Sequence, residues 1–406
     1  GALTKLRYSP SSRRRERDAT PPGEVSPLLG AIEARTGLLL GLAALVAVVW
    51  ATSDPRGYMG VVHLGAVHGV GVLRLPSDAE AWIDDAAMAL FFLVVGLELS
   101  RELSFGELSD RRVALLPIAG AAGGMAGAAL VYLAVAHGGD LTRGAGVPTA
   151  TDIAFAVGAL AVLGRRVPAG LRLFVLVLAV ADDLGSLAVL VLGYSNRIDG
   201  PRLGVALACV LLFVLLRRVG VRAPWVYLVV GLVCWAALVS SGVEPALAGV
   251  ATGLALPPAG GEPGLLELRV GVVADLCVLP LFALANAGVD LASGFLSAPG
   301  AARVLVAMTA ARVVGKSAGV ALATLLVVRV ARGRLPDGVG VVQLIGGGLI
   351  CGVGFTVPLL VADRAFASAP PLLAAARAGL LLGSVVAFLA GALVLSLASR
   401  KRAAPQ

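Results

Sequence analysis

The sequence predicts an all-α polytopic membrane protein with about twelve transmembrane helices. Its 406 residues are 58% hydrophobic, and the mean hydropathy is +0.92. Only 14% of the residues are charged, whereas soluble domains carry about 25%. Glycine is abundant, with 52 residues, and it is more frequent in membrane helices than in soluble ones. Because a span takes about 20 residues, the chain is long enough for about a dozen crossings.

Twelve apolar runs, separated by short polar segments, make up this prediction. The fourth and the eighth runs are shorter than most of the others. The runs cover residues 36–52, 82–99, 113–136, 148–163, 170–193, 203–216, 224–240, 245–257, 268–287, 301–328, 339–366 and 376–398.

The positive charges indicate the orientation of the chain. The net charge is +8, and the Lys and Arg residues gather in short clusters between the apolar runs. Most of these 33 residues fall in cytoplasmic segments if both termini are cytoplasmic, as the positive-inside rule requires. This position of the charges favours a membrane protein over a nucleic-acid-binding protein.

The first 30 residues differ from the rest because they are polar and contain prolines and the basic run Arg13-Arg14-Arg15. They predict a disordered, basic cytoplasmic tail (residues 1–30) that touches anionic lipid. Residues 31–400 then form a single transmembrane domain.

Several smaller features are predicted to be structural. In the long outside loop from Ser53 to Ala81, segments 61–64 and 70–73 are β-prone and could pair as a hairpin. The histidines lie in outside loops and are interpreted as surface residues: His63, His68 and His137. The cysteines fall in apolar runs without metal-ligand spacing and are predicted to be small buried side chains: Cys209, Cys234, Cys277 and Cys351.

Two adjacent carboxylates are the feature around which the sequence is organised. Asp182 and Asp183 lie within the apolar run 170–193. A charge at the centre of a membrane helix costs roughly 2.5–3.5 kcal/mol on insertion scales. A tight cytosolic turn is the alternative, but apolar or small residues flank the pair on both sides. The pair therefore predicts a cation and proton site buried in the membrane.

Two apolar runs are interrupted by residues that break helices. In the fourth run, Pro148, Thr151 and Asp152 stand where the middle of a span is expected. In the eleventh run, five glycines between positions 346 and 354 precede Pro358. Non-helical backbone is tolerated at membrane depth only where it is buried in protein or lines a cavity. The two runs hold corresponding places in the triplets three to five and ten to twelve, as in inverted-repeat transporters.

Two basic residues, Arg312 and Lys316, lie inside the tenth run. Lys316 is too deep in the run to reach water easily. A buried ammonium needs a carboxylate partner, and the candidates are Asp182, Asp183 and Asp152.

Four further polar residues admit more than one interpretation. Glu98 and Glu102 share a helix face at the cytoplasmic end of the second run, either as a solvated helix end or as an acidic mouth that attracts cations. Asp275 and Asn286, in the ninth run, are expected to make hydrogen bonds that pack helices together rather than to bind an ion.

Seven strings of residues occur in a specific order along the chain. They are Phe91 to Glu102, Ala150 to Phe155, Ala181 to Gly185, Ser241 to Gly249, Pro280 to Val289, Gly315 to Gly319, and Ile350 to Thr356. Together they resemble the NhaA family of bacterial sodium/proton antiporters, from about Gly30 to Leu397. NhaA proteins are themselves among the inverted-repeat transporters in which paired interrupted spans are known. The two interrupted runs therefore add no support for the resemblance that is independent of this family.

The resemblance implies an inverted-repeat fold whose fourth and eleventh helices are discontinuous and cross. It implies that Asp182 and Asp183 bind Na⁺ and H⁺, with Thr151 nearby. Asp152 and Lys316 would balance the dipoles of the broken helices, and Lys316 would pair with Asp182 when no ion is bound.

The resemblance also implies a transporter rather than an enzyme, without a cofactor. The expected activity is electrogenic, alternating-access exchange of cytoplasmic Na⁺ or Li⁺ for external H⁺, in pH and sodium homeostasis. The protein would lie in the bacterial inner membrane as a homodimer held by the first outside loop. Three residues would form a cytoplasmic cluster linked to pH activation: Glu98, Glu102 and Glu267.

The chain departs from the family pattern at several positions. Where characterised members carry histidines, this sequence has Leu268, Arg269 and Glu244. Ser100 stands where a basic residue is common, and Asp84 where an amide is common. With no histidine predicted on the cytoplasmic side, activation by a titrating imidazole is not expected.

Two other function classes are compatible with membrane carboxylates. The alternative is a sodium-coupled solute symporter of the same architecture, which would need a polar solute pocket. An intramembrane aspartyl protease would place its two aspartates on separate helices with a shared proton. The location of Asp182 and Asp183 on one predicted helix, with Lys316 available, argues against the protease.

Overall fold

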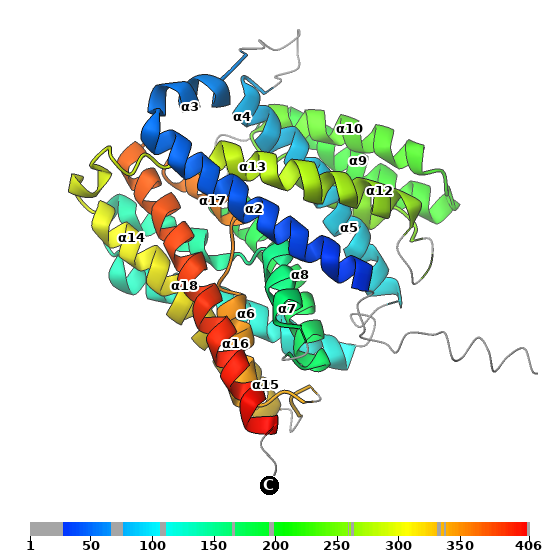
Figure 1. Ribbon diagram of the computed structural model, residues 1–406. Coiled ribbons are helices and arrows are strands. Elements are labelled where there is room, and N and C mark those ends of the chain that lie inside the picture. Colours follow the sequence, from blue (N-terminus) through cyan, green and yellow to red (C-terminus); the bar gives the residue numbers. More distant parts are fainter. Residues whose placement is uncertain are drawn as a thin grey trace, which may run out of the picture.

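The computed structural model describes residues 27–65, 76–105, 111–164, 167–194, 199–258, 260, 264–330, 334–336 and 338–403. Every regular element in these segments is a helix, as the sequence predicts. Figure 1 shows that the longer helices pack against one another as a bundle. Most of the predicted tail lies outside the described residues, and Pro27 already begins a helix.

The first half of the chain, up to the aspartate pair, contains both long helices and short irregular ones. In order these are α2 (Pro27–Ser53), α3 (Pro55–Val62), α4 (Ala79–Trp82), the π-helical turn η1 (Ile83–Ala87), α5 (Met88–Phe105), α6 (Arg111–Val135), the 3₁₀ helix η3 (Gly139–Thr149), α7 (Ile153–Leu163) and α8 (Ala169–Tyr194).

The second half has a similar mixture. Its elements are α9 (Gly200–Val219), α10 (Pro224–Ser241), α11 (Ala246–Ala255), α12 (Leu265–Val273), the π-helical turn η5 (Ala274–Val278), α13 (Leu279–Asn286), the 3₁₀ helix η6 (Phe295–Ser297), α14 (Ala301–Ala310), the π-helical turn η7 (Ala311–Lys316), α15 (Ser317–Val330), α16 (Val341–Ile350), α17 (Thr356–Ala365) and α18 (Pro370–Ala403).

Length and composition identify membrane spans among these helices. Five of the described helices are long and apolar enough to cross a bilayer: Leu115–Val135, Pro224–Ser241, Leu265–Asn286, Ala301–Val330 and Pro370–Ser399. Large apolar side chains cover the outer faces, among them Leu211, Leu232 and Leu322. An exposed apolar surface of this extent is typical of a protein that contacts lipid.

The helices form two packed groups. In one, α5 packs against α11 and α12, and α9 packs against α10. In the other, α6 packs against α8 and α15, and α18 packs against α14 and α16. Figure 1 shows α9 and α10 on one side of the molecule and α14 to α16 with α18 on the other. The helices α2, α7 and α13 connect the groups, because α2 contacts both α7 and α13.

Glycines let the backbones of α6 and α15 approach closely. A Cβ atom added to Gly123 would lie 2.5 Å from the Gly319 carbonyl oxygen, and one added to Gly127 would lie 2.4 Å from that of Gly315. Small residues at helix contacts are a main means of packing helices in membranes. The close approach places the turn η7, which ends at Lys316, directly against α6.

Three long helices contain a π-helical turn, and each turn carries charged residues. Asp84 and Asp85 lie in η1, Asp275 lies in η5, and Arg312 and Lys316 lie in η7. A π turn inserts one residue into a helix and changes which side chains face the neighbours, and such turns are frequent at functional sites.

The prediction of a β-hairpin in the loop before α4 is wrong at the first of its two strands, residues 61–64. Residues 55–62 form helix α3, and residues 63–65 are not a strand either. Asp54 accepts a hydrogen bond from the Gly57 amide at 3.0 Å, and Pro55 occupies the first turn. A capping aspartate followed by proline starts a helix, and this local signal outweighs the β-branched residues. The second predicted strand, 70–73, lies outside the described residues.

The cysteine prediction is wrong at one position. Cys209, Cys234 and Cys351 are buried, but Cys277 is exposed, because it lies on the outer side of the π turn η5. Apolar runs in a membrane protein have a lipid-facing side as well as a buried side, so an apolar neighbourhood in sequence does not ensure burial.

Candidate ion-binding site

Helix α8 carries the two adjacent carboxylates deep inside the protein. Asp182 is 0% exposed and Asp183 is 2% exposed. The helix continues from Ala169 to Tyr194 without interruption, so the cytosolic-turn alternative is excluded. On a regular helix, adjacent side chains point roughly 100° apart, and the two carboxylates therefore face different neighbours.

The two predicted interruptions are present, and they contact each other. The 3₁₀ helix η3 ends at Thr149 and α7 begins at Ile153, while α16 ends at Ile350 and α17 begins at Thr356. The Thr151 hydroxyl donates to the Cys351 carbonyl oxygen at 2.7 Å. The Asp152 amide donates to the Val353 carbonyl oxygen at 3.2 Å. Backbone groups freed by one interruption are thus satisfied by the other.

Asp152 lies between the N-termini of two helices. Its Oδ1 accepts from the Phe155 amide at 3.2 Å, in the first turn of α7. Its Oδ2 accepts from the Thr356 amide at 3.3 Å and the Thr356 hydroxyl at 3.1 Å, at the start of α17. A carboxylate is stabilised at a helix N-terminus by the free amides and the helix dipole. One side chain here serves two helix ends.

Lys316 reaches the aspartate pair from the turn η7. Its ammonium group contacts the Asp182 carboxylate and the Thr149 carbonyl oxygen, and its side chain is buried. The sequence leaves three candidate carboxylate partners for Lys316, and in the structure its ion-pair partner is Asp182. The contact with Thr149 also brings positive charge to the C-terminal end of η3, where helix carbonyls lack partners.

Arg312 also belongs to the site, although sequence reasoning gave it no role. The side chain is 0% exposed. Its Nη1 donates to the Gly352 carbonyl oxygen at 2.7 Å and its Nη2 to the Ala150 carbonyl oxygen at 3.4 Å. One guanidinium therefore holds both interruptions. The signal that could have found it is a second basic residue one turn before Lys316 in an apolar run.

Among the predicted pH-response residues, Glu267 pairs with Arg101 of α5. Arg101 Nε lies 3.1 Å from Glu267 Oε1, and Glu267 Oε2 accepts from the Gly264 amide at 3.3 Å at the start of α12. Glu98 lies one turn before Arg101 and Glu102 on α5. The side chain of Glu102 lies outside the described residues.

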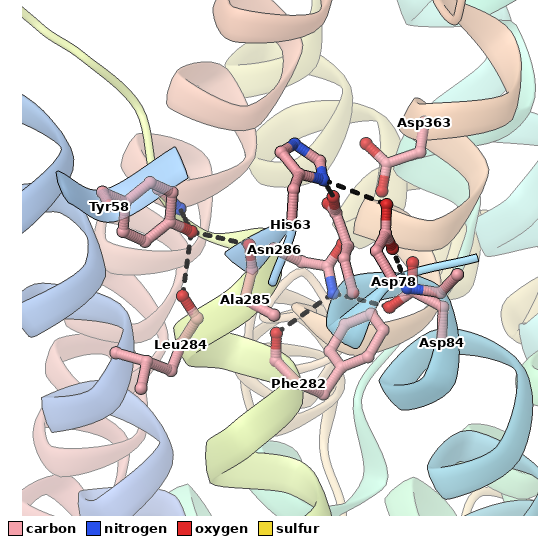
Figure 2. Close-up of polar contacts among 12 residues, drawn as sticks. Tyr58, His63, Asp78, Asp84, Phe282, Leu284, Ala285, Asn286 and Asp363 are labelled. Atoms are coloured by element: carbon pink, nitrogen blue, oxygen red, sulfur yellow. Dashed lines mark hydrogen bonds and ion pairs between the residues drawn. The ribbon is translucent and has the colours of Figure 1, made fainter. Parts of the chain in front are cut away.

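A second group of charges, here called the rim cluster, lies where the segment after α3 meets α4, η1, the connection between α10 and α11, α13, α17 and α18. It consists of His63, Asp78, Glu80, Asp84, Asp85, Glu244, Asp363, Arg364 and Arg377. Figure 2 shows part of it, with Asn286 donating to Asp84 Oδ1 at 2.7 Å. The expected packing role of Asn286 is consistent with this bond and with a second one to the Phe282 carbonyl oxygen at 3.2 Å.

Two arginines hold the rim cluster together. Arg377 lies 2.7 Å from Asp363 and 3.6 Å from Glu80, and Arg364 lies 3.6 Å from Glu244. Glu244 lies in the connection between α10 and α11 and is almost fully buried. Burial raises the pKa of Glu244 to about 7, against the opposing effect of Arg364.

The histidines that the structure describes agree with their predicted surface location. His63 and His137 are exposed, and His63 lies 3.3 Å from Asp78 and 3.4 Å from Glu80. His68 lies outside the described residues.

Comparison with known proteins identifies the family. The sequence profile of the family described as Na⁺/H⁺ antiporter 1 matches residues 29–395. The chain belongs to the Na⁺/H⁺ antiporter 1 family. The resemblance found in the sequence is thereby confirmed.

Curated members of the Na⁺/H⁺ antiporter 1 family match over most of their length. A protein from Acidovorax sp. (strain JS42), named Na(+)/H(+) antiporter NhaA, is 43% identical over 370 residues, covering 88% of each chain. Proteins of the same name from Serratia proteamaculans (strain 568) and Escherichia coli O1:K1 / APEC are 39% and 40% identical. These two alignments cover 88% and 87% of this chain and 94% and 93% of the relatives.

Proposed function

We infer from this membership that the chain is a sodium/proton antiporter, a multi-pass protein of the bacterial inner membrane. We propose that Asp182 and Asp183 form the site that Na⁺ and H⁺ share. One observation carries the proposal. Both carboxylates are buried, and Oδ1 of each has no hydrogen-bond partner among the described residues. Buried oxygens with no partner are costly unless a cation or a proton binds them.

Competition for the same oxygens explains exchange. A carboxylate that binds a proton loses the charge that attracts Na⁺, so the two ions displace each other. Two interacting carboxylates titrate as a coupled unit. Because two carboxylates can carry more protons than sodium ions in one cycle, exchange moves net charge, and transport is electrogenic. Li⁺ has the same charge and chemistry and enters the same site.

Lys316 and Asp152 serve as supporting charges in this proposal. Lys316 neutralises Asp182 when no ion is bound, and Na⁺ or H⁺ replaces that contact. Asp152 stays with the two helix N-termini that it caps. Thr151 contributes a hydroxyl oxygen that keeps free lone pairs while its hydrogen is donated to Cys351.

The wider architecture in this proposal has twelve crossings in inverted repeats. The contact between residues 150–152 and residues 351–355 supports a crossing of the fourth and eleventh helices at the membrane centre. The distribution of Lys and Arg supports cytoplasmic termini. We propose that Glu98, Glu102 and Glu267 respond to cytoplasmic pH through carboxylates and Arg101. The homodimer through the first outside loop stays a prediction.

Sodium-jump currents test the proposed function. Purified protein in proteoliposomes, adsorbed on a solid-supported membrane, is exposed to steps in Na⁺ concentration at several pH values. We expect a transient current and a pH change inside the vesicles without any organic solute. A current that requires an organic solute would identify the sodium-coupled symporter instead, and no current at any pH would contradict both.

A further inference from the structure

Ser186 is a buried hydroxyl on α8, one turn beyond the aspartate pair. The side chain is 0% exposed. Its Oγ has no hydrogen-bond partner in the part of the chain that the structure describes. A buried hydroxyl with nothing to bond to loses roughly 1–3 kcal/mol relative to a satisfied one, so the position calls for an explanation.

Three other helix hydroxyls behave differently, whereas the buried Thr324 Oγ1 of α15 also lacks a partner among the described residues. Ser104, Thr252 and Ser317 each donate to the carbonyl oxygen four residues earlier, at 2.6–2.7 Å. That bond is the usual way for a serine or threonine to be satisfied within a helix. Ser186 has the same carbonyl within its reach, that of Asp182, and does not use it. Its oxygen is therefore left free for another partner.

Helix geometry places this free oxygen between the two carboxylates. With about 100° of rotation per residue, Ser186 lies roughly 40° from Asp182 and 60° from Asp183 around the helix axis. It lies about 6 Å and 4.5 Å further along that axis. Residues three and four apart are neighbours on a helix surface, so the hydroxyl borders both aspartates.

Six carbonyl oxygens of the two interruptions already have donors. Lys316 holds the carbonyl of Thr149, and Arg312 holds those of Ala150 and Gly352. The remaining donors are Thr151 to Cys351, the Asp152 amide to Val353, and Ser384 to Gly354. A sodium ion placed at the oxygens held by Lys316 or Arg312 would meet a positive charge.

Around the aspartate pair, the buried oxygens that lack partners among the described residues lie on α8. They are Asp182 Oδ1, Asp183 Oδ1 and Ser186 Oγ, and all three are buried. Among the described residues no group of three or more His, Cys, Asp or Glu side chains could hold a metal ion. A hard cation held here therefore needs oxygens of another kind, and hydroxyl oxygen is suitable.

We propose that the Ser186 hydroxyl is a ligand of the transported Na⁺, completing the oxygen set that Asp182 and Asp183 begin. This inference rests on the proposed function. Ser186 lowers the Na⁺ concentration needed for transport without contributing to proton binding, because a hydroxyl remains neutral over the working pH range.

The test compares Ser186→Ala with wild type and with Ser241→Ala as a matched control. Ser241 is also a buried serine, but its hydroxyl donates to Leu238 at 2.9 Å in α10. Sodium-jump currents give KM for Na⁺ and the maximal current for each full-length protein. We expect Ser186→Ala to raise KM roughly tenfold while the maximal current stays within about twofold. Ser241→Ala should keep the wild-type KM.

The pH profile provides a readout that a packing role would not move. At sub-saturating Na⁺, weaker sodium binding lets protons compete better, so the Ser186→Ala profile shifts to more alkaline pH. At saturating Na⁺ the profile should return to that of wild type. Ser186→Cys, which keeps the volume but replaces oxygen with a soft sulfur ligand, should raise KM in the same way.

Two results would overturn the inference about Ser186. One is a KM within twofold of wild type in both variants, and the other is a fall in maximal current with KM unchanged. These are distinct from a failure of the proposed function, in which wild-type protein itself gives no sodium-driven current.

Discussion

The candidate ion-binding site around Asp152, Asp182, Asp183, Arg312 and Lys316, here called the central site, gathers acidic groups as the rim cluster does. The two regions neutralise these groups differently. At the centre, Asp152 is held by backbone amides and Asp182 by one ammonium, while Asp183 has no cation within ion-pair distance in the described part of the chain. In the rim cluster, Arg364 and Arg377 each bridge two carboxylates. Both regions contain buried carboxylate oxygens without a hydrogen-bond partner among the described residues, including Glu244 Oε1 and Asp363 Oδ2 in the rim cluster. The rim cluster differs because arginines neutralise these carboxylates, which leaves less negative charge for an incoming cation.

The difference also concerns which structural elements are joined. At the centre, main-chain carbonyls and amides of two interrupted helices contact each other directly, and Arg312 binds one carbonyl of each. In the rim cluster the contacts are mostly between side chains (Figure 2). A change at the centre should alter ion handling, and a change in the rim cluster should alter stability.

The largest expected effect is the loss of transport in Asp183→Asn. An amide of the same shape carries neither the charge that attracts Na⁺ nor the proton that replaces it. Sodium-driven current and pH change should fall to background. Asp275→Asn, an intramembrane aspartate in η5 without a proposed ion role, is the control and should keep transport. Exchange at the wild-type rate in Asp183→Asn would show that the site is assigned to the wrong residue.

Arg312→Leu should be the next most damaging change. It leaves the carbonyl oxygens of Ala150 and Gly352 without their buried donor, at roughly 1–3 kcal/mol each. We expect a lower thermal unfolding midpoint in detergent and weaker transport. Arg312→Lys keeps the charge but lacks the fork that reaches both carbonyls, so it should recover only part of the stability. If Arg312→Leu is as stable as wild type, the guanidinium does not hold the interruptions together.

A change in the rim cluster should affect the pH dependence of stability. The pKa of Glu244 in the folded protein is about 7, above the ordinary value of 4.5 for a glutamate, because the side chain is buried. A raised pKa means that the folded state binds this proton more tightly. The resulting stabilisation is present below pH 4.5 and is lost as pH rises through 7, by about 3 kcal/mol at pH 8.

Glu244→Gln should remove this dependence. Thermal unfolding of wild type and variant, measured from pH 5 to pH 8, should give a smaller decline for the variant, with little change in KM for Na⁺. An equal decline in the two proteins would show that Glu244 does not titrate in this range. A large change in KM would place Glu244 in the ion site rather than in the rim cluster.

The smallest effect is expected from replacing His63, His68 and His137 together by asparagine. His63 is an exposed partner of Asp78 and Glu80, and exposed ion pairs contribute less than about 1 kcal/mol. The pH profile of transport should stay the same because the two described histidines, His63 and His137, are exposed and lie outside the central site. A shift of the profile would identify one of these histidines as a pH sensor.

Much of the central site could be predicted from the chain because charge in an apolar run is costly. Asp182, Asp183 and Lys316 stood out for that reason, and glycines and prolines marked both interruptions. The rim cluster could not be found in this way. Glu80, Glu244, Asp363 and Arg377 lie near the ends of different runs, where charged residues are ordinary, and only their convergence distinguishes them.

Sequence by itself determined the helical membrane class, the family and the aspartate pair, because hydrophobic period, length and misplaced charges are local properties. Only the tertiary structure decided which partners meet. Arg312 donates to carbonyl oxygens of both interrupted segments. The nearby Thr151–Cys351 bond joins the same two segments and connects residues that are 200 positions apart in the sequence. Likewise the contacts between helix faces decide that Cys277 is exposed and that Ser186 has no hydrogen-bond partner among the described residues. Such pairings depend on packing between distant helices, which no local pattern encodes.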